Sequence, residues 1–460
     1  MSFNKLFEII EQNKDEMLNT LSEWIKIPSV KGESADGAPM GIEISNMLNK
    51  AVQDCKNMGF NVRNFDGYAC DARMGKIGAD PLAILAHIDV VPTGDNWEKD
   101  PFGAEIENGF MYGRGTQDDK GPAVAALYAM KAVKEAGINL NREVRLILGT
   151  DEESGWECMN YYKEHCDIPK SGFSPDANFP VINTEKGIIR IDVKAKPSKG
   201  GIQIVKLYTG ERSNVIPGKC KATILGDQKT LDLVNKYAKE LDCTVSAGLD
   251  GNLVNIEVIG IPGHAAMPEG TKNAIGLMLK LLSKLGVQGA VKGLADLVGT
   301  ESDGCSLGVK CSDAISGELT LNMGIIRIDA DRVEATFDIR FPILIDYTSL
   351  FNTISFSLKQ YGFDCALFSH TSPHHVPESS ELVQKLLKAY REETGDNTPP
   401  IAIGGGTYAK ILEEGVAFGS IFPDEQELAH QANEKCSIDN LVKNTKIIAK
   451  AIVYLCGENE

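Results

Sequence analysis

Residues Leu85–Pro92, LAHIDVVP, join the end of an apolar segment to an imidazole and a carboxylate in a chain of 460 residues. The run Leu82–Ala86 before His87 is short and uninterrupted, which is typical of a buried strand. Such a strand seldom ends in two polar side chains unless both have partners. We therefore interpret His87 as the first ligand of a two-metal site, with Asp89 holding the other ring nitrogen of His87.

The hydrophobic pattern divides the chain into two regions, as its length also suggests. In the outer region, strand-like runs such as Glu143–Leu148 alternate with helical segments, which indicates a mostly parallel sheet. In the middle, runs such as Ile188–Lys196 alternate apolar and polar residues, as in antiparallel strands with one solvated face. We predict an α/β catalytic domain, a mostly parallel sheet flanked by helices, at 1–186 and 378–460. A large inserted α+β lid domain, in two α+β halves, is expected at 187–377.

Composition excludes several classes of function. The chain carries 47 basic and 64 acidic side chains, a net charge of −17, and would repel the phosphate backbone of a nucleic acid. Its 11 cysteines include no C-x-x-C pair, which favours free thiols in a reducing compartment. The N-terminus is charged, unlike a signal peptide, and no segment approaches the roughly 18–20 apolar residues that span a bilayer. We expect a cytoplasmic protein without nucleic-acid or membrane partners.

Other acidic and histidine side chains stand at the ends of predicted strands or in the loops that follow. They are Asp118, Glu153, Asp176 and His430. Ligands of an open α/β sheet gather outside the carboxyl ends of its strands, so these residues are expected near His87. Two histidines and three carboxylates suit two divalent cations that share one carboxylate. Two such cations, about 3.5–4 Å apart, would hold and acidify one water molecule.

Glu152 stands directly beside the candidate ligand Glu153. Neighbouring side chains of an extended backbone diverge, so the two carboxylates cannot both point at one pair of cations. Glu152 is therefore the candidate general base that faces the water. Each of these residues alone is more often a cap, a turn residue or a core histidine, and the prediction depends on their combination.

Five segments carry a resemblance to a known family. They read LAHIDVVP (85–92), YGRGTQDDKGP (112–122), GTDEESG (149–155), SPDANFP (174–180) and LAHQANE (428–434). In this order they resemble the signature segments of the zinc-dependent aminoacylase, carboxypeptidase and dipeptidase superfamily, and most of all those of bacterial V-type, carnosinase-like dipeptidases. The resemblance implies two Zn²⁺ per chain, with Mn²⁺ or Co²⁺ possible on the same ligands.

The resemblance also implies a role for each ligand. Asp118 would bridge the two cations. One cation would add His87 and Asp176, and the other Glu153 and His430. Asp89 would be the outer partner of His87, and Glu152 the base that later passes its proton to the leaving amine.

For the lid domain the resemblance implies groups that close over the substrate. His264 would donate to the developing oxyanion, and Arg340 would grip the substrate carboxylate in a bidentate manner. A glycine loop before a helix-like stretch, Tyr408–Glu413, favours an anion, here a substrate carboxylate. The residues expected to contact substrate are Asn214, Arg340, Gly405, Gly406 and Thr407.

The leading interpretation is a di-metal dipeptidase that hydrolyses unblocked dipeptides through a metal-bridging water, with Glu152 as general base. An alternative in the same superfamily is an N-acyl-amino-acid deacylase or desuccinylase. An alternative of another class is a non-catalytic metal-binding or peptide-binding protein. The insert is nearly twice the size of the simple α+β lid that many members of this superfamily use for dimerising. Superfamily members with a double lid resemble a dimer folded into one chain, so the resemblance implies a monomer.

Overall fold

The structure is a computed structural model that describes residues 3–458. The chain forms two compact units. The first, called the main unit, comprises Met1–Asn183, Val376–Ile401 and Gly406–Glu460. The second, called the insert, comprises Thr184–His375 and Ala402–Gly405.

The return of Ala402–Gly405 to the insert differs from the expected division, which left the whole of 378–460 in one domain. The reason is a strand pairing that no local pattern reveals. Strand β23 (Ile401–Ile403) pairs with β9 (Ile182–Glu185), and the Lys186 N–H donates to the Ile403 carbonyl at 2.9 Å. Both strands therefore run across the boundary between the units.

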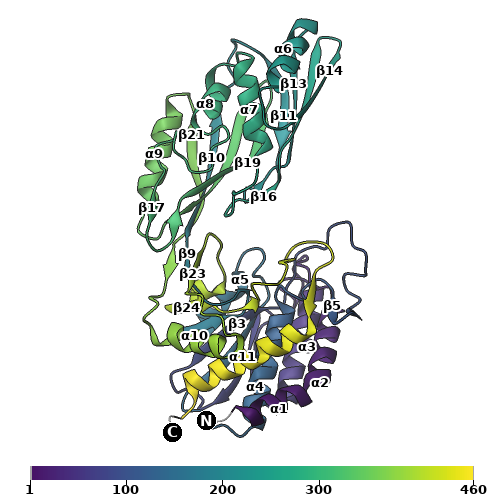
Figure 1. Cartoon of the computed structure of the whole chain (residues 1–460), viewed down its shortest axis with the longest axis vertical. Helices are drawn as coiled ribbons and strands as arrows, with labels where there is room; N and C mark the ends of the chain where they lie inside the picture. Colours follow the sequence, from purple (N-terminus) through teal and green to yellow (C-terminus); the bar gives the residue numbers. More distant parts are fainter. Residues whose placement is uncertain (1–2, 459–460) are drawn as a thin grey trace. The chain divides into compact units, whose positions relative to one another are not determined.

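The main unit contains both helices and strands (Figure 1). Its first part contains α1 (Asn4–Gln12), α2 (Lys14–Ile25), α3 (Ile42–Asn57), β1 (Asn61–Phe65), β2 (Ala69–Gly75), β3 (Leu82–His87), β4 (Glu105–Glu107), β5 (Phe110–Tyr112), α4 (Lys120–Glu135), β6 (Glu143–Gly149), α5 (Glu157–His165), β7 (Ser171–Ser174) and β8 (Ala177–Asn178). Its later part contains α10 (Glu381–Thr394), the 3₁₀ helix η1 (Tyr408–Ile411), β24 (Glu414–Ala417), β25 (Ser420–Ile421), β26 (Lys435–Ser437) and α11 (Ile438–Cys456).

The large sheet has the strand order β1-β2-β6-β3-β7-β24-β9-β22, where β22 is His374–His375. Its centre, β6-β3-β7-β24, is parallel, and antiparallel strands form both edges. Every residue of β3 is buried because both faces are covered: Ile84 packs into the core beneath α1–α4, α10 and α11, and Leu85 packs into a second core with α5. The predicted buried strand and the mostly parallel sheet flanked by helices are confirmed.

The insert is built around a single antiparallel sheet. Its elements are β10 (Gly187–Ala195), β11 (Ile204–Thr209), β12 (Val215–Ile216), β13 (Lys219–Leu225), α6 (Gln228–Ala238), β14 (Thr244–Asp250), β15 (Leu253–Ile259), β16 (Gly263–His264), α7 (Ala274–Lys284), α8 (Gly289–Leu297), β17 (Ser312–Asp313), β18 (Gly317–Glu318), β19 (Thr320–Ile328), β20 (Val333–Phe341), α9 (Tyr347–Lys359), β21 (Asp364–Thr371) and β22 (His374–His375). The order is β14-β15-β13-β11-β19-β20-β10-β21, so the β11–β19 pairing joins the two expected halves into one continuous sheet.

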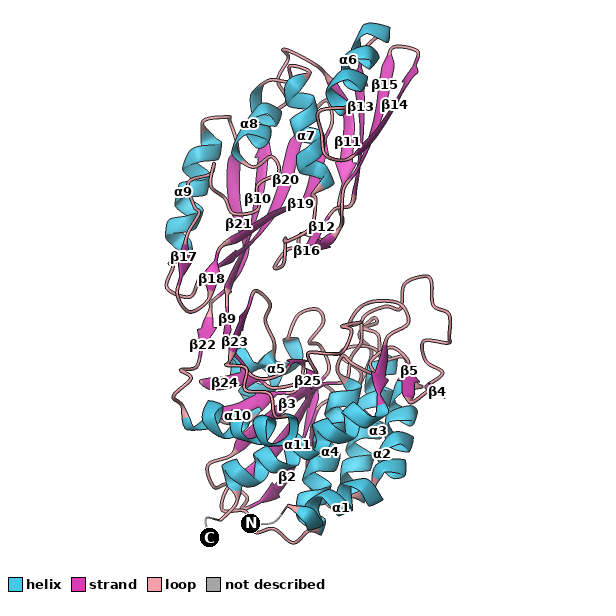
Figure 2. Ribbon diagram, viewed as in Figure 1, coloured by secondary structure: helices cyan, strands magenta, loops and turns pink. Residues whose placement is uncertain are grey.

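Burial alternates along the strands of the insert, as in β13, because one face packs under α6–α9 and the other is solvated (Figure 2). No helix within residues 3–458 has the length and apolar character needed to cross a bilayer.

Candidate metal centre and active site

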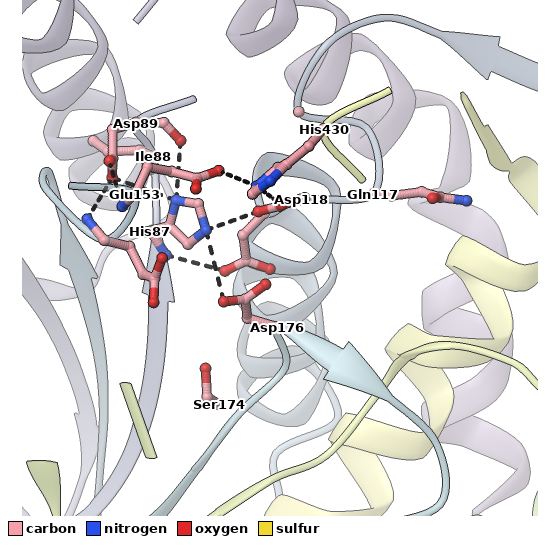
Figure 3. A network of polar contacts seen from close by, with 12 residues as sticks. His87, Ile88, Asp89, Gln117, Asp118, Glu153, Ser174, Asp176 and His430 are labelled. Atoms are coloured by element: carbon pink, nitrogen blue, oxygen red, sulfur yellow. Dashed lines mark hydrogen bonds and ion pairs between the residues drawn. The ribbon is translucent and has the colours of Figure 1, made fainter. Parts of the chain in front are cut away.

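The five predicted ligands come from separate elements of the main unit and converge at one edge of its sheet (Figure 3). His87 ends β3, and Asp118 lies just before α4. Glu153 and Asp176 follow β6 and β7, and His430 lies in the loop before β26. The carboxyl ends of parallel strands meet at this edge, which is where such sheets bind ligands.

The five side chains form two groups that share one residue. His87, Asp118 and Asp176 make the first group, and Asp118, Glu153 and His430 make the second, with the donor atoms of each group within 4.8 Å of one another. The two oxygens of Asp118 face different histidines: Oδ1 lies 3.0 Å from His87 Nε2, and Oδ2 lies 3.0 Å from His430 Nε2. The Asp118 carboxylate is thus the residue that the two groups share.

The remaining distances complete the two groups. Asp176 Oδ2 lies 3.7 Å from His87 Nε2, and Glu153 Oε1 lies 2.9 Å from His430 Nε2. Imidazole nitrogens and carboxylate oxygens are the donors preferred by zinc and similar divalent cations. The donor set therefore fits a pair of such cations.

The electrostatics of the cluster also favour bound cations. Burial raises the pKa of Glu152 and Asp176 well above the ordinary range and also raises that of Glu153. The nearby carboxylate of Asp118 raises all three further. Burial lowers the pKa of His430, but hydrogen bonds to Asp118 and Glu153 outweigh this effect and raise the pKa to about 10. Carboxylates crowded in this way are stabilised by added positive charge.

Asp89 lies between His87 and the turn after β6. Its Oδ1 is 3.3 Å from His87 Nδ1, and its main-chain carbonyl lies 2.9 Å from the same nitrogen. Its carboxylate also accepts hydrogen bonds of 3.2 Å from the main-chain N–H groups of Glu152 and Glu153. Asp89 thus contacts both His87 and the backbone of the two glutamates. The contact with His87 was predicted from the sequence, and the contact with the glutamate backbone was not.

Glu152 is half-buried and lies in the same turn as Glu153. The turn is held by the buried Asp151, whose carboxylate pairs with Lys31 Nζ at 2.7 Å and accepts the Glu157 N–H at 3.0 Å. A carboxyl group with a raised pKa beside a metal-ligand cluster is suited to accept and return a proton. Asp151 and Lys31 were not singled out from the sequence, and only their contacts reveal this support.

The loop before α4 is shaped by a close approach of backbone to backbone. A Cβ on Gly121 would lie 2.1 Å from the Thr116 carbonyl oxygen, so only glycine fits. The Gly121 N–H donates to the Gly115 carbonyl at 3.0 Å, which folds residues 115–121 back on themselves. Asp118 lies within this folded segment, just before α4.

Two of the predicted substrate residues lie together in the insert. His264 belongs to β16, which pairs with β12 through Val215, and the Ala265 N–H donates to the Asn214 carbonyl at 2.9 Å. The His264 side chain is exposed. The arrangement brings His264 and Asn214 to one end of the insert sheet.

Arg340 has partners within the insert. Its Nε and Nη2 lie 2.5 and 3.2 Å from the two carboxylate oxygens of Asp338, and its Nη1 donates to the Gly404 carbonyl at 2.7 Å. Residues two apart on a strand share a face, which is why Asp338 can reach it. The bidentate partner of Arg340 in this structure is thus Asp338, whereas the resemblance implied a substrate carboxylate.

The glycine loop also differs from expectation. Gly405 belongs to the insert, and Gly406 and Thr407 belong to the main unit. The helix expected at Tyr408–Glu413 is the single 3₁₀ turn η1, capped by Thr407 Oγ1, which accepts the Ala409 N–H at 3.2 Å. A single 3₁₀ turn has little helix dipole. The α-helix at 408–413 on which the anion-site prediction depended therefore does not form.

Comparisons with known proteins agree with this geometry. The sequence model of "Peptidase family M20/M25/M40" matches residues 83–454. A Bacillus subtilis (strain 168) protein described as "Putative dipeptidase YtjP" is 36% identical over 97% of this chain and 98% of its own length.

Two solved structures share the fold. Human carnosine dipeptidase 1 has a TM-score of 0.63 at 16% identity and is covered over 99% of both chains. Bacillus subtilis YXEP, described as a dinuclear metal binding peptidase from the M20 family, has a TM-score of 0.53 at 10% identity, over 97% of this chain and 99% of that chain. The resemblance inferred from the five segments is confirmed, and the non-catalytic alternative is not supported. The chain belongs to peptidase family M20/M25/M40 and is a peptide-bond hydrolase.

Proposed function

We propose that the protein is a dipeptidase that hydrolyses unblocked dipeptides with the help of two divalent cations, zinc in the first instance. The observation that carries the proposal is the position of Asp118, whose two oxygens each face a different histidine. The relative YtjP and the human carnosine enzyme are both named for dipeptidase activity, and YXEP is described as binding two metals. These names support the substrate class and the number of cations.

In this proposal each group of ligands holds one cation. His87 and Asp176 would complete the first site, and Glu153 and His430 the second, with Asp118 common to both. When bound, the cations would acidify a water molecule and polarise the scissile carbonyl. Mn²⁺ and Co²⁺ accept the same nitrogen and oxygen donors and are alternatives to zinc.

Glu152 would do the proton transfer. Its carboxylate would take a proton from the attacking water as the oxygen bonds to the carbonyl carbon, and would return it to the leaving amine nitrogen as the C–N bond breaks. Burial raises its pKa above the ordinary range of a carboxyl group, and a carboxyl group with a raised pKa is suited to accept and return a proton. Asp89 would keep the His87 ring oriented, since it lies against Nδ1.

The cellular setting is also part of the proposal. All 11 cysteines are free thiols, which supports a reducing compartment and hence the cytoplasm. A monomer remains the expected state. The role predicted for His264 as a donor to the oxyanion, and those predicted for Asn214 and Arg340 in binding substrate, also remain predictions.

The decisive experiment compares Glu152→Gln with Glu157→Gln, a matched change at an exposed glutamate of α5. Glu152→Gln should keep both cations and lose about 10²-fold or more in kcat, since it removes the base. Glu157→Gln should behave as wild type. Rates are measured with defined metals on free dipeptides, including β-alanyl ones, and metal content is measured on the same samples.

The substrate panel also includes N-acetyl and N-succinyl amino acids. Cleavage of these alone, with no turnover of free dipeptides, would favour the deacylase or desuccinylase alternative. A Glu152→Gln enzyme that retains full activity with both cations bound would reject Glu152 as the base. Activity that survives removal of every cation by a chelator would reject the proposed chemistry.

A further inference from the structure

The two loops that carry Asp118 and His430 start from neighbouring strands. Strand β5 (Phe110–Tyr112) pairs in antiparallel fashion with β26 (Lys435–Ser437). The Asp118 loop, residues 113–118, follows β5, and the His430 loop, residues 426–434, precedes β26. The strand pair therefore brings together the loop residues next to β5 and β26. The residues farther along each loop, including Asp118 and His430, must be positioned by other contacts.

Glu434, at the end of the His430 loop, makes such contacts with the Asp118 loop. Its side chain is fully buried. Its Oε1 accepts the main-chain N–H groups of Gly115, Gln117 and Asp118 at 3.0, 2.8 and 3.2 Å. Its Oε2 accepts a hydrogen bond from the guanidinium of Arg114. One carboxylate thus binds four donors from a five-residue stretch that ends at the shared ligand.

Gln117 makes the reciprocal contacts. Its Nε2 donates to the Gln426 carbonyl at 3.0 Å, and its Oε1 accepts the Leu428 N–H at 2.7 Å. The side chain points away from Asp118 in Figure 3, toward the backbone that leads to His430. Each loop therefore holds the backbone of the other loop with one side chain.

We propose that Glu434 and Gln117 form a reciprocal clasp that positions the two ligand-bearing loops, so that the metal centre depends on two residues that are not themselves ligands. This inference rests on the proposed two-cation site. Glu434 and Gln117 are positioning residues, because neither faces the reacting atoms.

The contacts predict different consequences for the two members of the clasp. Glu434 binds the N–H of Asp118, and Asp118 belongs to both ligand groups. Loss of the Glu434 carboxylate should therefore weaken the binding of both cations. Gln117 binds the backbone just before His430, which belongs to the second group only. Loss of the Gln117 amide should weaken mainly the binding of the cation held by the second group.

The test uses three variants of the full-length chain. Glu434→Gln keeps the shape of the side chain but removes its charge, and Gln117→Met keeps the length but removes both hydrogen bonds. Glu427→Gln is the matched control, because Glu427 is an exposed glutamate on the same loop. Each metal-free protein is titrated with Mn²⁺, and free Mn²⁺ is followed by electron paramagnetic resonance.

Wild type and Glu427→Gln should bind two Mn²⁺ with the same affinities. Glu434→Gln should bind both about 10–100-fold more weakly, which is the usual effect of losing an outer partner of metal ligands. Gln117→Met should show this loss for one of the two ions. Amide hydrogen exchange at residues 113–118 should be faster in metal-free Glu434→Gln than in Glu427→Gln, a readout that needs neither metal nor substrate.

A Glu434→Gln protein that binds two Mn²⁺ as tightly as wild type would overturn the clasp. If that variant does not fold, a Gln117→Met protein with two unchanged affinities would overturn it instead. A wild type that binds two Mn²⁺ but cleaves no dipeptide would overturn the proposed function, whereas the clasp is judged by the metal titration and by hydrogen exchange, neither of which needs substrate.

Discussion

The two sheets of this protein differ in how their strands are buried. All six residues of β3 in the main unit are buried, because helices cover both faces of its sheet. In β13 of the insert, buried Ile224 is followed by Leu225, which is 43% exposed, because helices cover only one face. Strand β3 carries its one polar side chain, His87, at its end, whereas β13 carries polar side chains along its exposed face.

This difference explains why the residue pattern itself points to His87 as a ligand, whereas the insert residues could be named only from the family resemblance. In the main unit, His87 interrupts an apolar pattern at the point where the strand ends, so its chemistry stands out. In the insert, Arg340 is one of several polar residues that alternate along their strands. A pattern of alternation shows which face a residue occupies, but it does not show its partner.

The largest effect is expected from the histidine of the insert. His264→Ala should lower kcat by about 10²–10³-fold, as expected for loss of an oxyanion donor. Both cations should remain bound, since the candidate ligands all lie in the main unit. The matched control is His370→Ala, at an exposed histidine of β21. Turnover and metal content are measured on the same samples, and unchanged turnover in His264→Ala would assign His264 a purely structural role.

Core substitutions compare the two kinds of strand directly. In the main unit, Ile84→Ala and Leu85→Ala should each cost about 2–5 kcal/mol of unfolding free energy, because both side chains are fully buried, on opposite faces of β3. In the insert, Ile224→Ala should cost as much, and Leu225→Ala about 0.5 kcal/mol or less.

The costs are measured by hydrogen exchange with mass spectrometry, which reports each unit separately. A Leu225→Ala variant as destabilised as Ile224→Ala would show that both faces of the insert sheet are covered in solution.

The smallest effect concerns exposed aromatic residues of the insert. Phe356 on α9 and Phe368 on β21 are 71% and 67% exposed. If the chain is a monomer, Phe356→Ser and Phe368→Ser should leave its mass in solution at 49.9 kDa and change stability by about 0.5 kcal/mol or less. Light scattering after gel filtration measures the mass. A wild-type protein of twice this mass would contradict the predicted monomer. If either substitution then converted this dimer to monomers, the exposed phenylalanine would lie in its interface.

The amino-acid sequence alone sufficed for the fold class, the family and the set of candidate ligands. Apolar runs indicate strands wherever a sheet is buried, and donor types at strand ends indicate a metal site. The turn Asp151–Glu153 could be placed for the same reason, because it follows the fully buried strand β6. These features depend on local order along the chain.

Other features depend on side chains and strands that meet only in the folded chain. The pairing of β23 with β9 assigns Ala402–Gly405 to the insert, and the contact with Asp338 engages Arg340. The four donors around Glu434 come from a loop more than 300 positions earlier in the chain. Hydrogen bonds between distant segments leave no periodicity in the sequence, so only the tertiary structure decided them.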